Sequence, residues 1–125
     1  MTYLEAEKQL VLFLAELLGL EPDRNVFVGA LPIGMEEGIT VSLEEGHPAT
    51  QSQANTFTAL VCGYSRSRRG VRSQAFEMAS ALPVFGKSGL LSISMNEKMP
   101  LKFAVSGEKK DVQHSFSLSL TVSFV

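Results

Sequence analysis

Four arginines lie within seven consecutive positions, in the segment YSRSRRGVR that begins at Tyr64. Guanidinium groups form paired hydrogen bonds with phosphate and carboxylate oxygens, so such a cluster can bind DNA, a phosphate group or an acidic protein surface. No base-reading motif accompanies it, and a contact with DNA would therefore be transient and independent of base sequence. A solvated loop is the third interpretation. The four residues, which are candidate contacts with a second subunit or a partner, are Arg66, Arg68, Arg69 and Arg72.

The segment ALPVFGKS (residues 81–88) nearly matches the phosphate-binding loop of nucleotide enzymes, with Ala81 at the usual position of the first glycine. That loop needs a strand before it and a helix after it, because loop amides and the helix N-terminus hold the phosphate. Here a helical pattern precedes the segment and a strand pattern follows it, and Pro83 has no amide hydrogen to donate. The sequence context argues against a nucleotide site.

Other catalytic and metal-binding signatures are weak. The two histidines, His47 and His114, have no further ligand at zinc-site spacing, and no serine lies in a nucleophile-elbow motif. The adjacent carboxylates Glu36–Glu37 and Glu44–Glu45 point apart and indicate solvated charge. Cys62 lies in the apolar run FTALVCGY, which is typical of a buried, inert thiol. We therefore predict a protein that is not an enzyme, with no cofactor and no metal.

The first helix is predicted from a capping box and from apolar spacing. Thr2 and Glu5 have the T-x-x-E arrangement that caps a helix start, and Gly19 suits its end. Leucine and valine recur between them at helical spacing, and this set is predicted to face the core: Leu4, Leu10, Val11, Leu14, Leu17 and Leu18.

The opposite stripe of this helix is expected to be polar, but two large apolar residues interrupt it. Leu12 falls inside the stripe and Phe13 falls beside it. A helix that is apolar nearly all round is either buried on two sides or contacts a partner. Leu12 and Phe13 are therefore candidate interface residues. The polar residues of the stripe are Glu5, Lys8, Gln9 and Glu16.

The remaining segments predict an α+β domain spanning residues 1–125, with two helices packed on a mixed, largely antiparallel sheet in the order αβββαβββ. A second helix follows the arginines and ends before Pro83, and Gly70 is expected to relieve a bend in the arginine turn. The polar segment EEGHPATQSQ (residues 44–53) is expected to be a mobile connection. The segments with strand patterns are residues 25–29, 39–43, 55–64, 90–95, 101–107 and 114–125.

The last strand alternates without interruption between two kinds of side chain. Phenylalanine, leucine and valine occupy the even positions from Phe116 to Phe124, and serine or threonine occupies the odd positions from Ser115 to Ser123. One face is therefore predicted to be core. An exposed strand of this length would invite aggregation, so we expect a helix or a neighbouring subunit to cover Ser117, Ser119 and Thr121.

Length and charge favour one domain that can contact copies of itself. The chain has 125 residues, of which 45% are hydrophobic and 19% charged, which suits a single globular domain. Residues 1–62 carry nine acids and two bases, whereas residues 63–125 carry four acids and nine bases. Such halves can form head-to-tail contacts between copies, unless both mix on the folded surface.

Membrane insertion is not expected. The apolar run LVLFLAELL, which starts at Leu10, is shorter than the roughly 20 residues that span a bilayer. Glu5 and Glu7 precede it where a signal peptide would carry positive charge. These features predict a cytoplasmic protein without a targeting segment and without a membrane partner.

The order of these segments resembles the small minor capsid or tail terminator proteins of long-tailed bacteriophages and prophages. The similarity covers nearly the whole chain. It includes the strand NVFVG, a loop that carries Leu31 and Pro32, the strand ITV, a basic turn, the helix RSQAFEMASAL and a paired C-terminal sheet.

The resemblance implies a structural subunit of the virion tail that assembles in the host cytoplasm. Such a subunit would form a homo-oligomeric ring, usually a hexamer, on the tail tube, stop tube growth and join the head connector. Its implied partners are copies of itself, the tail tube protein and the head connector protein, with DNA passing through the ring. Two alternatives stay open: another connector, head-completion or tail tube subunit, and a small-molecule-binding domain or enzyme.

Overall fold

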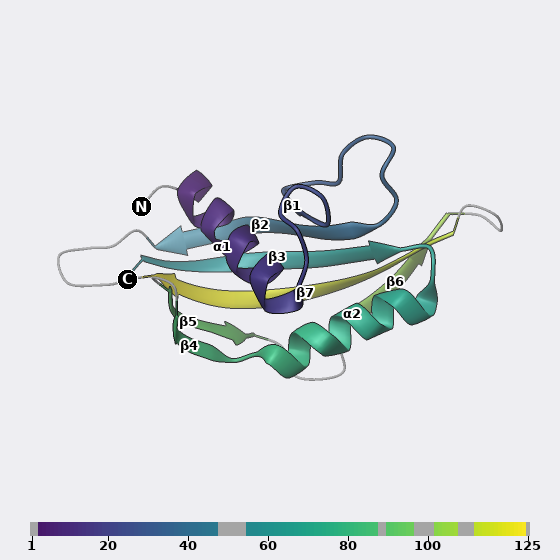
Figure 1. Cartoon of the computed structure of the whole chain (residues 1–125). Coiled ribbons are helices and arrows are strands. Elements are labelled where there is room, and N and C mark those ends of the chain that lie inside the picture. The colour runs from purple at the N-terminus through teal and green to yellow at the C-terminus, as the bar shows by residue number, and fades with distance from the viewer. Residues whose placement is uncertain (1–2, 48–54, 88–89, 97–101, 108–111, 125) are drawn as a thin grey trace.

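The computed structural model describes residues 3–47, 55–87, 90–96, 102–107 and 112–124 (Figure 1). Two helices, each followed by a run of strands, form one α+β arrangement in these residues, which confirms the predicted fold class. The elements, in chain order, are α1 (Tyr3–Leu18), β1 (Val26–Val28), β2 (Gly38–His47), β3 (Asn55–Ser65), α2 (Arg68–Ala81), β4 (Val84–Lys87), β5 (Leu90–Met95), β6 (Lys102–Ser106) and β7 (Gln113–Phe124).

The seven strands of the described residues belong to one sheet, in the order β1-β2-β3-β7-β5-β4, with β6 also paired to β7. Neighbouring strands are antiparallel except β1 and β2, which are parallel. The long strands β3 and β7 form the centre of the sheet. β5 pairs with the C-terminal half of β7 and β6 pairs with its N-terminal half, along the same edge.

The predicted order of elements is confirmed, with two extensions. Strand β4 (Val84–Lys87) lies in the segment that resembles a phosphate-binding loop, so a helix precedes that segment and a strand runs through it. Strand β2 continues to His47, opposite Thr56 of β3, where the sequence predicts a mobile connection. The rest of that connection, residues 48–53, lies outside the described residues.

The alternation of β7 is confirmed as a two-faced strand. Its five even-numbered apolar side chains are fully buried in one core with side chains from both helices: Phe116, Leu118, Leu120, Val122 and Phe124. Both helices therefore pack on this one face of the sheet (Figure 1). In the described part of the chain no helix covers the opposite, hydroxyl face, which leaves a neighbouring subunit as the expected cover. Cover by a neighbouring subunit stays a prediction.

The hydroxyl face of the sheet is half-buried and rich in hydrogen bonds between side chains. Asn96 donates to the Ser119 hydroxyl over 3.0 Å and accepts a hydrogen bond from Thr121. Burial, followed by interaction with the Cys62 thiol, raises the pKa of the Tyr64 phenol. Tyr64 is therefore neutral at physiological pH and adds no charge to this face.

Helix α1 faces the sheet more broadly than its leucine pattern indicates. Phe13 is only 9% exposed and belongs to the core, which corrects its expected position beside the polar stripe. Leu12 is 57% exposed, as predicted, and Leu4, expected in the core, is 56% exposed. Phe13 is buried because it lies three residues after Leu10 and seven after Ala6, both buried, so all three share one side of the helix.

Candidate assembly surface

The arginine segment is divided between the connection that the sequence predicts and helix α2: Arg66 and Ser67 join β3 to α2, and the helix starts at Arg68, earlier than expected. Ser67 is the N-cap, and its hydroxyl accepts a hydrogen bond from the Gly70 amide over 3.1 Å. Arg68 and Arg69 therefore occupy the first turn, and Gly70 is helical rather than a bend. A Cβ at Gly70 would lie 3.0 Å from the Ser65 hydroxyl oxygen, which explains a small residue at this position.

This helix start is electrostatically unfavourable. A helix N-terminus carries a partial positive charge and favours acidic side chains in its first turn. The first turn of α2 has no acidic residue, and it contains Arg68 and Arg69, with Arg72 one turn further on. Within the described residues, no carboxylate lies at ion-pair distance from Arg68 or Arg69. The surface here attracts anions.

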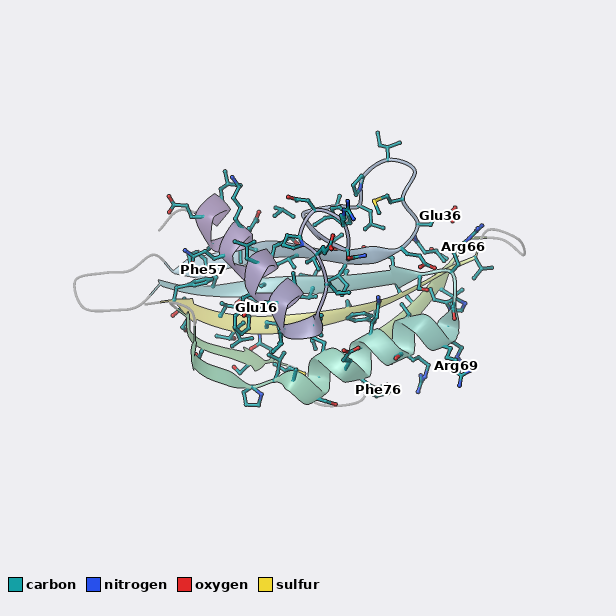
Figure 2. The ribbon with its side chains drawn as sticks, viewed as in Figure 1. Glu16, Glu36, Phe57, Arg66, Arg69 and Phe76 are labelled. Carbon is teal, nitrogen blue, oxygen red and sulfur yellow. The ribbon has the colours of Figure 1, made fainter. Side chains whose placement is uncertain are left out.

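Arg66 differs from Arg68 and Arg69 because a carboxylate of the same chain pairs with it. Its Nε lies 3.0 Å from a carboxylate oxygen of Glu36, and Figure 2 shows the two side chains together at one end of the sheet. The Gln113 amide donates to the Glu36 carbonyl over 3.1 Å, and the Ser65 hydroxyl donates to Glu37 over 3.3 Å. These contacts attach the loop between β1 and β2 to the ends of β3 and β7.

Arg72 lies against two aromatic rings. Its guanidinium carbon is 5.3 Å from the centre of the Phe76 ring and 5.0 Å from that of Phe103. Phe76 belongs to α2 and Phe103 to β6, and their ring centres are 6.2 Å apart. Each such cation–π contact contributes about 0.5–1 kcal/mol at an exposed site. Arg72 therefore joins the helix to the sheet edge with its charge still exposed.

A groove separates the start of α2 from the edge of the sheet. It has a volume of about 330 Å³. Val105, which lines it, is 63% exposed. The groove combines an apolar floor with two guanidinium groups, and its lining includes Arg68, Val71, Arg72, Phe103, Val105 and His114. A smaller cavity of about 240 Å³ lies beside the Arg66–Glu36 pair.

The structure places the four predicted arginines at one end of the molecule, around the start of α2. Figure 2 shows Arg69 on the N-terminal turns of this helix. Leu12 lies apart from them on the outer side of α1. The exposed apolar side chains that the sequence did not identify include Ile33 and Val105. The Pro-x-Gly spacing around Ile33 is a turn signal from which its exposure could have been predicted. Nothing in the strand pattern distinguishes Val105 as exposed.

The described residues contain neither a metal-binding cluster nor a helix suited to cross a membrane. No group of three or more histidine, cysteine, aspartate or glutamate side chains among them is placed to hold a metal ion. In the same residues, neither helix has the length and apolar character needed to cross a membrane.

Comparisons with known proteins assign no family to this chain. No model of a known protein family matches it, and neither does any curated protein. Among solved structures, it is similar to a chain in the virion of the native gene transfer agent particle, with 16% sequence identity and a TM-score of 0.47. That similarity covers 89% of this chain and 83% of the other.

Proposed function

We propose that this chain is a structural subunit of a phage-type virion and not an enzyme. It assembles by contacts with copies of itself and with neighbouring virion proteins. The observation that carries the proposal is the start of α2, where Arg68 and Arg69 face the positive end of a helix without a carboxylate of the described chain beside them. This arrangement opposes the stability of the isolated chain, so an anionic partner is the reason we propose for it.

The exposed apolar side chains support the same proposal. Leu12 and Val105 each expose more than half of their surface, on α1 and β6 respectively. Apolar side chains that a partner desolvates, surrounded by charged groups, are the usual anchors of protein interfaces. The interface that we propose includes Leu12 and the arginines of α2, and no longer includes the buried Phe13.

The specific role that we propose is that of a tail terminator or minor capsid subunit. It would form a ring on the tail tube, stop tube growth and offer the surface that joins the head connector. The order of elements that resembles such proteins supports this role. Another connector, head-completion or tail tube subunit is the second candidate, because it would assemble by the same kind of contact.

Reversing the charge of Arg68 and Arg69 tests the proposal, because stability and assembly are expected to change in opposite directions. The double variant R68E/R69E places acids at the helix N-terminus, so the free energy of unfolding of the isolated chain should rise by about 0.3–1 kcal/mol per residue. Assembly should be lost at concentrations where the unaltered chain forms rings. Urea unfolding measures the first effect, and sedimentation with electron microscopy measures the second.

Arg24 provides a matched control, because it is also exposed and pairs only weakly, with Glu21 at 3.4 Å. The variant R24E should assemble like the unaltered chain. A compensating acid-to-base change that restores assembly of R68E/R69E would identify the opposing surface. Rings that form normally but lose salt-dependent DNA binding would instead place the arginines in the lumen. Normal assembly with no effect on DNA would show that they are merely solvated.

A further inference from the structure

The loop between β1 and β2 presents an isoleucine at the tip of a tight turn. The Met35 amide donates to the Pro32 carbonyl over 3.0 Å, and Gly34 has a φ of +88°. Glycine in the third position of a turn with positive φ is typical of a type II turn, which places Ile33 in the second position. Ile33 is 106% exposed, and the neighbouring Met35 is also exposed.

The base of this loop is fixed, so the isoleucine is held in a defined place. The Gly29 amide donates to the Val41 carbonyl over 2.9 Å, and the Ile39 amide donates to the Asn25 carbonyl over 2.8 Å. The Glu36–Arg66 pair holds the far side of the loop. A side chain presented by a fixed turn loses little conformational freedom when a partner binds it. Ile33 thus has the character of a preorganised apolar anchor.

The groove beside α2 has the properties needed to bind such an apolar anchor. Phe103 and Val105 give it apolar surface above the buried Val71, and Arg68 and Arg72 bring positive charge. Its volume of about 330 Å³ is at the lower end of the roughly 300–1,000 Å³ found for ligand pockets, which suits one or two aliphatic side chains.

The Ile33 turn and the groove also carry charges of opposite sign. The isoleucine turn is followed directly by Glu36, whose charge Arg66 balances, and by Glu37, whose carboxylate accepts a hydrogen bond from the neutral Ser65 hydroxyl and adds negative charge near the apolar tip. The groove has basic neighbours. Opposite charges around an apolar contact steer two surfaces together and fix their register.

The position of the two surfaces excludes contact within one chain. The turn extends from the β1–β2 side of the sheet, whereas the groove lies at β6, beyond β3 and β7. In Figure 1 the loop and the start of α2 lie on opposite lateral sides of the sheet, towards the same end. The full exposure of Ile33 agrees with this separation.

We propose that Ile33 of one copy binds in the α2–β6 groove of a second copy of this chain. The contact joins two different surfaces, so it repeats head-to-tail and closes into a ring when the rotation between copies allows it. This inference rests on the proposed assembly function and specifies which surfaces carry it.

Two variants that each disable one surface test the contact. I33D places a charge on the anchor, and V105W fills the groove; both residues are exposed, so neither change should disturb folding. Each variant alone should associate at least about tenfold more weakly than the unaltered chain, as expected for an interface anchor. An equal mixture should form dimers that grow no further, because only one intact anchor and one intact groove remain in each pair.

Sedimentation of each variant and of the mixture gives the result, with thermal unfolding as a check on folding. Self-association of I33D equal to that of the unaltered chain, or a mixture without dimers, would overturn this contact. The proposed assembly function would then still stand if the unaltered chain forms rings and R68E/R69E does not. An unaltered chain that stays monomeric, alone and on tail tubes, would overturn both.

Discussion

Replacing Gly63 with valine is expected to lower the free energy of unfolding by about 3 kcal/mol or more, enough to unfold a marginally stable domain. Gly63 lies in the central strand β3, directly opposite Phe116 of β7. A Cβ added at Gly63 would lie 1.9 Å from the Phe116 ring. That ring is 1% exposed and packed in the core, so it cannot move aside without displacing its neighbours.

Urea unfolding of G63V, F116A and the double variant measures this effect. F116A alone should cost about 3–5 kcal/mol, as is usual when a buried phenylalanine is truncated. The double variant should be more stable than the sum of the single losses predicts, because removal of the ring makes room for the valine.

Thr58 supplies a control on the same strand. It is half-buried on the hydroxyl face, away from the Phe116 ring, and Thr58→Val should change the free energy of unfolding by less than about 1 kcal/mol. If G63V were as stable as this control, the close packing of Phe116 over Gly63 would be refuted.

The second prediction with a large expected effect compares substitutions at two adjacent residues of α1, one buried and one exposed. Phe13→Asp should lower the free energy of unfolding by about 3–5 kcal/mol or more, because it removes a buried ring and places a carboxyl group in the core. Leu12→Asp should change it by less than about 0.5 kcal/mol, because Leu12 is exposed.

The same two variants, F13D and L12D, also test whether the outer face of α1 takes part in assembly. Denaturant unfolding of the isolated chain is compared with the concentration at which rings form. We expect L12D to weaken ring formation while its unfolding curve matches that of the unaltered chain. A large loss of stability in L12D, or a folded and stable F13D, would contradict the way α1 packs on the sheet.

Patterns that are local in sequence were sufficient for most of the fold. The alternation of β7 predicts its buried face, because side chains of a strand point to opposite faces at every position. The predicted second helix is present, although it starts earlier than expected, and its buried residues Val71, Ala75 and Met78 recur at the spacing of one helix face. The α+β class and the order of elements follow from such periods and from the turn residues between them.

Only the tertiary structure decided which chemically distinct residues meet. Arg66 and Glu36 are thirty positions apart, and they meet just beyond the paired ends of β3 and β2. Gly63 and Phe116 are further apart still, and the pairing of β3 with β7 brings them together. The burial of Phe13 depends on the angle at which α1 docks, which a helix with apolar residues nearly all round does not encode. The groove beside α2 exists because β6 pairs with β7 under the start of the helix. Long-range pairing of this kind depends on the packing of the whole sheet, and no local spacing in the sequence specifies it.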